Sequence, residues 1–152
     1  MRKRALLGAV LAILVLGVAA VSVASSKITE PGRLVFVEHA DTDVVTDTGE
    51  VGDTAGDLLT FANPVYNATN TQQIGRDQGD CVRIDPATGK WQCRWIAWVG
   101  GGAITVEGPF FDTKDSVMAI TGGTGHYSNV RGTMQLHALS ATEFRFTYSI
   151  KP

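Results

Sequence analysis

Short stretches of alternating apolar and polar residues run along the chain, and turn-forming residues separate them. The last stretch is the clearest, because Phe144, Phe146 and Tyr148 share one face of an extended chain while polar residues occupy the other. Beyond residue 24, apolar residues nowhere keep a helical spacing over three turns. The pattern predicts an all-β protein with strands at residues 34–40, 58–62, 81–84, 91–99, 103–107, 117–121, 133–139 and 143–150.

Eight short strands at this spacing build either a β-sandwich or a β-barrel, and the alternation alone does not decide between them. Glycines gather mostly between the strands, where turns often need a positive φ angle. The glycine-rich residues 121–125 are predicted to form a tight turn of this kind. A phosphate-binding loop is not indicated there, because the Gly-x-x-x-x-Gly-Lys pattern is missing and the run opens no helix.

The first 24 residues have the composition of an export signal. Arg2, Lys3 and Arg4 form a basic start, residues 5–24 carry no charge, and small residues precede the expected cleavage after Ala24. We therefore expect a signal helix at residues 1–24, a linker at 25–32 and one folded domain at 33–152 of a secreted or extracytoplasmic protein. An uncleaved membrane anchor stays open as the alternative, because about 20 apolar residues can span a bilayer.

The charge balance argues against two classes of partner. The chain has 13 Lys and Arg residues against 15 Asp and Glu residues. Without the three basic residues of the expected signal, ten basic residues face fifteen acidic ones, a net charge of about −5. Nucleic acid and an anionic membrane surface are therefore not expected as partners.

The two cysteines flank a predicted hairpin turn at residues 85–89, where Asp-Pro is followed by glycine. If the hairpin is symmetric about Ala87, Cys81 lies opposite Cys93 and Ile84 lies opposite Lys90. Opposed cysteines of an exported chain favour a disulfide, and two buried free thiols stay open as the alternative. No metal site is predicted, because the three histidines show no ligand spacing around the cysteines.

One face of the strand at 91–99 is wholly apolar, with Trp91, Cys93 and Trp95 among its residues. This face is either barrel core or the wall of an aromatic cavity. Arg83 has the same parity as Cys81, so its charge is expected inside the barrel or at its rim. A buried guanidinium needs a carboxylate partner, and Glu38 is the candidate.

Several motifs appear in an order that resembles the allene oxide cyclase and dirigent superfamily over residues 33–151. They are Gly56 to Tyr66, Ile104 to Phe110, Ala119 to Gly125 and Phe144 to Tyr148. The resemblance implies an eight-stranded antiparallel β-barrel with a small apolar cavity. It also implies a homo-oligomer, expected to be a trimer, that works without a cofactor. Ile96 and Trp98, on the outward face of their strand, would supply a patch for the contact between subunits.

The resemblance also suggests where the site lies. Plant allene oxide cyclases use a first-strand glutamate, a water held by polar side chains and an apolar barrel to cyclise an unstable epoxide. Glu38 and Asn63 match that pattern and are the candidate catalytic residues. The expected ligand pocket is formed by Phe36, Phe61, Arg83, Trp91, Trp95, Phe110, Phe146 and Tyr148.

The sequence departs from the plant pattern at several positions. Ala40 replaces an asparagine, Phe110 replaces a tyrosine, and a disulfide would remove the Cys81 thiol. Dirigent proteins, which guide radical coupling outside the cell, fit the expected export better. We therefore expect a secreted barrel that binds a small hydrophobic molecule, with cofactor-free cyclase activity or dirigent-like guiding activity. The alternative is a non-catalytic module, either a lipocalin-like binder of a ligand or a filled barrel with a structural or interaction role.

Overall fold

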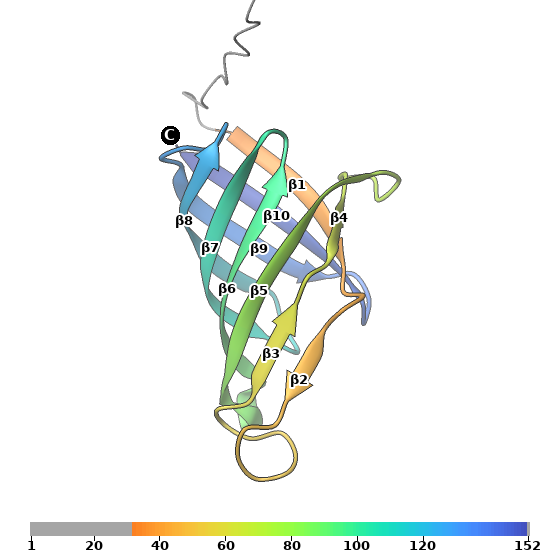
Figure 1. The fold of residues 1–152 in the computed structure, drawn as a ribbon, viewed down its shortest axis with the longest axis vertical. Helices are drawn as coiled ribbons and strands as arrows, with labels where there is room; N and C mark the ends of the chain where they lie inside the picture. The colour runs from red at the N-terminus through yellow and green to blue at the C-terminus, as the bar shows by residue number, and fades with distance from the viewer. Residues whose placement is uncertain (1–31, 152) are drawn as a thin grey trace, which may run out of the picture.

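The computed structural model describes residues 32–151, which form a closed antiparallel β-barrel (Figure 1). The expected signal helix and most of the expected linker lie outside the described residues. Within 32–151 there is no helix long and apolar enough to cross a membrane. The elements are β1 (Gly32–His39), β2 (Val44–Thr46), β3 (Leu58–Phe61), β4 (Pro64–Tyr66), β5 (Gln73–Asp85), the short 3-10 helix η1 (Pro86–Thr88), β6 (Lys90–Val99), β7 (Gly102–Phe111), β8 (Ser116–Gly125), β9 (Arg131–Ala138) and β10 (Glu143–Lys151).

The barrel has eight strand positions, as the resemblance implied. β3 and β4 are two pieces of one strand, broken at residues 62–63, and both pair with β5. β4 also pairs with β1, and the sheet then continues through β10, β9, β8, β7 and β6 until β6 pairs with β5 and closes the ring. The small strand β2 pairs with β3 in nearly the register in which β1 pairs with β4, so it continues the line of β1 after a break at residues 40–43.

Strand β5 is much longer than the predicted strand at 81–84. Its inward positions include Gly75, Asp77 and Gly79, so the apolar alternation that marks other strands is missing. The glycines are needed because a Cβ at Gly79 would collide with Trp95 and with the backbone of Arg94 on β6. The strand is therefore fixed by its fit to β6 rather than by apolar residues of its own.

The predicted turn at 121–125 is wrong, because these residues form the end of β8 and pair with β7. The chain turns only after Gly125. A Cβ at Gly123 would collide with the backbone of Tyr127 and of Ala103. The glycine thus lets the following turn fold closely over the end of the strand.

The predicted disulfide between Cys81 and Cys93 is present, with Cα atoms 4.0 Å apart. The expected pairing of Ile84 with Lys90 is wrong, because Asp85 lies opposite Lys90 and the register shifts after Arg83. Asp85 caps the short helix η1 by accepting a hydrogen bond from the backbone N–H of Ala87 at 3.0 Å. The turn therefore begins at residue 86 and not at the predicted residue 85.

Candidate functional site

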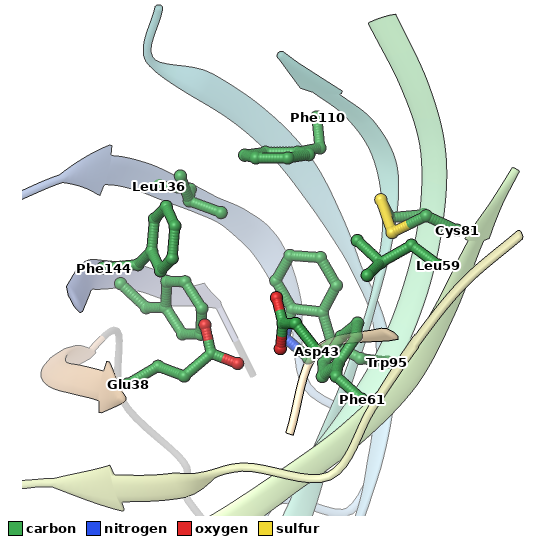
Figure 2. Close-up of a pocket in the computed structure, with 11 residues that line it drawn as sticks. Glu38, Asp43, Leu59, Phe61, Cys81, Trp95, Phe110, Leu136 and Phe144 are labelled. Atoms are coloured by element: carbon green, nitrogen blue, oxygen red, sulfur yellow. A yellow bond between two sulfur atoms is a disulfide. The ribbon is translucent and has the colours of Figure 1, made fainter. Parts of the chain in front are cut away.

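A pocket of about 40 Å³ opens into one side of the barrel interior (Figure 2). Its walls are mainly aromatic and aliphatic, and two carboxyl groups face into it, those of Glu38 on β1 and Asp43 before β2. The disulfide forms part of the wall opposite Glu38. The lining residues are Glu38, Asp43, Leu59, Phe61, Cys81, Cys93, Trp95, Phe110, Leu136, Phe144 and Phe146.

The structure brings together some of the predicted pocket residues and separates others. Phe61, Trp95, Phe110 and Phe146 line the pocket, and the Trp95 and Phe146 ring centroids are 5.4 Å apart. Two further predicted residues, Phe36 and Tyr148, are buried and pack against each other at 5.2 Å, but neither belongs to the lining. They form the core beside the pocket.

Glu38 lies inside the barrel, as the resemblance implied, with 5% of its surface exposed. Its Oε1 accepts a hydrogen bond from Asn63 Nδ2 at 2.9 Å. The same amide nitrogen donates to Asp43 Oδ1 at 2.7 Å, and Asn63 Oδ1 accepts from the backbone N–H and hydroxyl of Thr42. Asn63 is therefore fully occupied in holding Glu38 and Asp43 in place, which makes it a positioning residue for the two carboxyl groups.

A third carboxyl group, that of Asp77 on β5, lies behind Glu38. The backbones of Asp77 and Asn63 form a hydrogen-bonded pair, with N–O distances of 2.9 and 3.0 Å, which fixes Asp77 next to the Glu38 cluster. Asp77 is 1% exposed, and neither of its carboxyl oxygens has a hydrogen-bond donor within residues 32–151. Two ionised carboxylates cannot bond each other, because both only accept.

The electrostatics of this pair favour a shared proton. Burial raises the pKa of Glu38 to about 7, with opposition from the hydrogen bond of Asn63 and a smaller rise from the charge of Asp43. Burial, together with the charge of Glu38, raises the pKa of Asp77 to about 10. At neutral pH, Asp77 therefore keeps its proton while Glu38 is poised to exchange one.

Two buried donors also lack a partner beside this pair. The indole N–H of Trp95 and the hydroxyl of Tyr148 make no hydrogen bond within residues 32–151. Burial raises the pKa of Tyr148, and the charges of Asp77 and Glu38 raise it further. All the buried unpartnered side-chain atoms of the described chain belong to Asp77, Trp95 and Tyr148.

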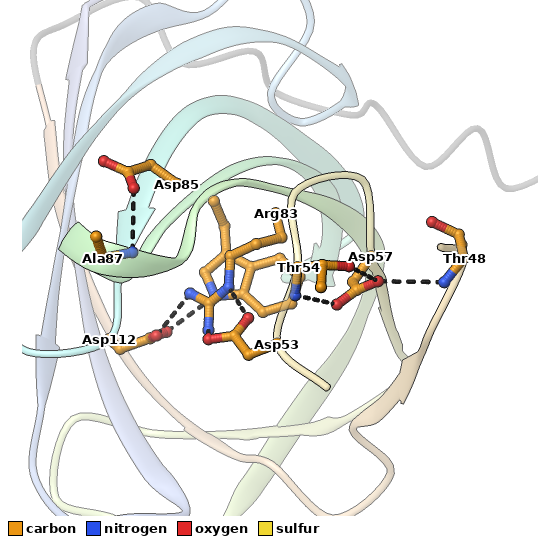
Figure 3. A network of polar contacts seen from close by, with 9 residues as sticks. Thr48, Asp53, Thr54, Asp57, Arg83, Asp85, Ala87 and Asp112 are labelled. Carbon is orange, nitrogen blue, oxygen red and sulfur yellow. Dashed lines mark hydrogen bonds and ion pairs between the residues drawn. The ribbon is translucent and has the colours of Figure 1, made fainter. Parts of the chain in front are cut away.

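The expected pairing of Arg83 with Glu38 is wrong. Arg83 Nε and Nη2 donate to the two carboxylate oxygens of Asp53 at 2.6 and 2.7 Å, and Nη1 donates to Asp112 at 2.6 Å (Figure 3). The guanidinium stacks on Trp91 at 4.1 Å, and the Trp91 indole donates to Asp112. Neither Arg83 nor Trp91 lines the pocket.

The acidic loop before β3 supplies a carboxylate partner for Arg83 other than Glu38. Asp57 in this loop accepts hydrogen bonds from the backbone N–H groups of Thr48 and Thr54 at 3.1 and 2.7 Å (Figure 3). These bonds hold the loop against the end of β5, where Arg83 N donates to Asp57 O at 2.8 Å. Asp53 is thereby brought over the guanidinium, which becomes a clamp between the loop and the turn after β7.

Sequence reasoning missed Asp43 and Asp77. Asp43 lies in a polar loop segment, where no alternation of apolar and polar residues indicates which side chains face the barrel interior. For Asp77 a signal existed: extending the hairpin register from Cys81–Cys93 away from the turn places Asp77 opposite Ala97, on the inward face. The polar, glycine-containing composition of residues 73–80 concealed this strand.

The fold and the acidic, aromatic pocket define a small antiparallel barrel with an interior pocket. The chain belongs to the allene oxide cyclase family, whose model matches residues 38–151. Three solved structures under 25% identical share the fold. A pyocyanin demethylase is 23% identical with a TM-score of 0.70, and the match covers 79% of this chain and 100% of that one.

The other two are a dirigent protein and a cycloaddition enzyme. A pterocarpan synthase dirigent protein is 19% identical with a TM-score of 0.66, and the match covers 80% of this chain and 93% of that one. An exo-specific intermolecular Diels–Alderase is 12% identical with a TM-score of 0.59, over 80% of this chain and 98% of that one.

Proposed function

We propose that the protein binds a small hydrophobic molecule in the pocket beside Glu38 and acts on it as a cofactor-independent isomerase or as a dirigent-like guide. The buried Glu38–Asp77 pair carries this proposal. It lies next to an apolar pocket and has no counter-charge among the described residues that line the pocket. Keeping two carboxyl groups in such a place costs stability, and proteins accept that cost most often at functional sites.

The roles of the residues follow from their contacts. The aromatic walls would hold the molecule in one conformation and exclude water from it. Glu38, with a pKa of about 7, would give or take a proton at neutral pH. Asn63 would fix the direction of the Glu38 carboxyl through its 2.9 Å hydrogen bond. Asp77 would stay protonated at neutral pH while Glu38 exchanges its proton.

Cyclisation of the plant fatty-acid epoxide is not the expected reaction. Phe110 lines the pocket without the hydroxyl that a tyrosine would supply, and the Cys81 sulfur is bound in the disulfide. The loss of a donor aimed at developing charge costs a factor of about 10² to 10³ in rate. A related reaction on a different molecule is therefore the better proposal.

A non-catalytic role is the second candidate, and the size of the pocket favours it. About 40 Å³ holds roughly three water molecules, so a ligand larger than that must displace side chains. A structural or interaction module with a filled barrel would have such an interior. The proposal of a ligand therefore includes an opening of the pocket.

Export and assembly belong to the same proposal. The disulfide Cys81–Cys93 favours an oxidising compartment outside the cytoplasm. The half-buried side chains of Ile96 and Trp98 lie on the outer wall of β6 and would join subunits, which we propose to form a trimer.

Native mass spectrometry of the purified protein tests these points together. We expect a retained small molecule and the mass of three subunits. Leu136→Trp, which fills the pocket, should lose the molecule, whereas the exposed control Glu107→Gln should keep it. A monomer would contradict the trimer. Wild-type protein that retains no molecule and also binds no toluene in solution would contradict the ligand-binding role.

A further inference from the structure

We propose that the pocket selects a positively charged aromatic molecule and rejects carboxylates such as fatty acids. This inference rests on the proposed ligand-binding function and names the class of its ligand. It is carried by the charges and rings that surround one pocket in Figure 2.

The charges of the pocket have one sign. Glu38 and Asp43 both face into it, and a single amide nitrogen, Nδ2 of Asn63, donates to both. No lysine or arginine of residues 32–151 is among the lining residues. Arg83 cannot move in as a counter-ion, because its donors are occupied by two other aspartates. The negative charge at this site is therefore uncompensated within the described protein.

The walls of the pocket suit a cation that is itself apolar. A cation over the face of an aromatic ring is attracted by the electrons of that ring, most strongly where water is excluded. Small inorganic ions are strongly hydrated, whereas a methylated or heteroaromatic cation spreads its charge over an apolar surface. The five aromatic side chains that line the pocket are Phe61, Trp95, Phe110, Phe144 and Phe146.

A second observation points to a ligand at this place. The indole N–H of Trp95, in the lining, and both oxygens of the almost fully buried Asp77, behind Glu38, lack partners within residues 32–151. An anionic ligand would add a third negative charge to Glu38 and Asp43 and would gain only the Trp95 donor. A cationic ligand would instead stabilise the ionised form of Glu38.

Four small aromatic probes separate the possibilities: N-methylpyridinium, toluene, benzoate and phenol. Dissociation constants can be measured by ligand-observed NMR at pH 8 on the full barrel domain. We expect N-methylpyridinium to bind at least about fivefold more tightly than toluene, and benzoate to bind more weakly than toluene. Glu38→Gln should remove most of the preference for the cation, whereas the exposed control Glu107→Gln should leave it unchanged.

The preference should also depend on pH. The titratable groups that face Glu38 are Asp43, Asp77 and Tyr148. Because the pKa of Glu38 is about 7, more of it is ionised at pH 8 than at pH 6, so cation binding should tighten as the pH rises. Toluene binding should change little over the same range.

The outcomes distinguish this inference from the proposed function. Equal binding of toluene and N-methylpyridinium, or a preference for benzoate, would overturn the cationic ligand and leave a hydrophobic pocket standing. A preference for phenol over N-methylpyridinium would also overturn it, in favour of a neutral hydrogen-bond donor. If none of the probes binds, the proposed binding function fails with it.

Discussion

Two acidic clusters belong to the same barrel, one at its end and one beside the pocket, and they are built in opposite ways. Near the β5–β6 turn, Asp53 and Asp112 surround Arg83, and every contact is a short charge-assisted hydrogen bond. Beside the pocket, Glu38 and Asp77 share no cation, and both oxygens of Asp77 lack a donor within residues 32–151. The first cluster contains a cation supplied by the protein itself, and the second does not.

The difference separates a structural role from a candidate functional one. A paired guanidinium closes the barrel end by tying the loop of Asp53 to the turn of Asp112. Although burial alone would lower the pKa of Arg83, its hydrogen bonds to the two aspartates raise it. Buried carboxyl groups without a cation add no comparable stability to the fold, because burial opposes their ionisation. Because the carboxyl groups of Glu38 and Asp77 lie beside a pocket, we propose a ligand or a proton as their partner.

The largest expected effect is a loss of stability as the pH rises. Glu38 and Asp77 have raised pKa values of about 7 and about 10, so the folded protein keeps protons that the unfolded chain has lost above pH 4 to 4.5. Stability therefore falls from that point up to the folded pKa of each group. We expect the free energy of unfolding, measured with urea, to fall by several kcal/mol between pH 5 and pH 8.

The double variant Glu38→Gln/Asp77→Asn isolates this effect. Its free energy of unfolding should be nearly level over the same range, because the amides do not titrate. Arg83 contributes no slope here, because its hydrogen bonds raise a pKa that already lies far above this range. A wild-type free energy of unfolding that rises between pH 5 and pH 8, or a double variant with the same slope, would contradict the assignment.

The next effect concerns the paired cluster. Arg83→Met keeps much of the packing on Trp91 but leaves Asp53 and Asp112 without their cation. Because Arg83 is covered while the two aspartates are partly exposed, we expect a loss of about 2 kcal/mol in the free energy of unfolding. The control is Arg94→Met, whose exposed bridge to Asp80 should contribute less than about 0.5 kcal/mol. Equal losses in the two variants would show that Arg83 is an ordinary surface ion pair.

The sequence predicted the fold well where strands carry their own apolar alternation. β6 and β10 were found because every second residue is apolar, and the hairpin disulfide followed from the positions of Cys81 and Cys93. The first half of β5 was missed because its inward positions hold Gly75, Asp77 and Gly79. The inward residues of such a strand are set by its packing against β6, so the local sequence of β5 does not reveal them.

The site was predicted in part for a related reason. A resemblance placed Glu38 inside the barrel, but the choice of Arg83 as its partner came only from the rule that a buried cation needs a carboxylate. The rule was correct, and it was satisfied by Asp53, which belongs to a loop without a recognisable pattern. Parity along a strand tells which residues point inward, but it does not tell at which level of the barrel they meet.

The smallest expected effect compares one aspartate from each cluster at pH 6. Asp77→Asn should change the free energy of unfolding by less than about 0.5 kcal/mol, because the wild-type carboxyl is already protonated and the amide has nearly the same shape. Asp112→Asn should cost about 1 kcal/mol, because it weakens charge-assisted bonds from Arg83 and Trp91. Urea unfolding of both variants measures the difference. If Asp77→Asn costs more than Asp112→Asn, then Asp77 is ionised and held by a partner, and the contrast between the two clusters is lost.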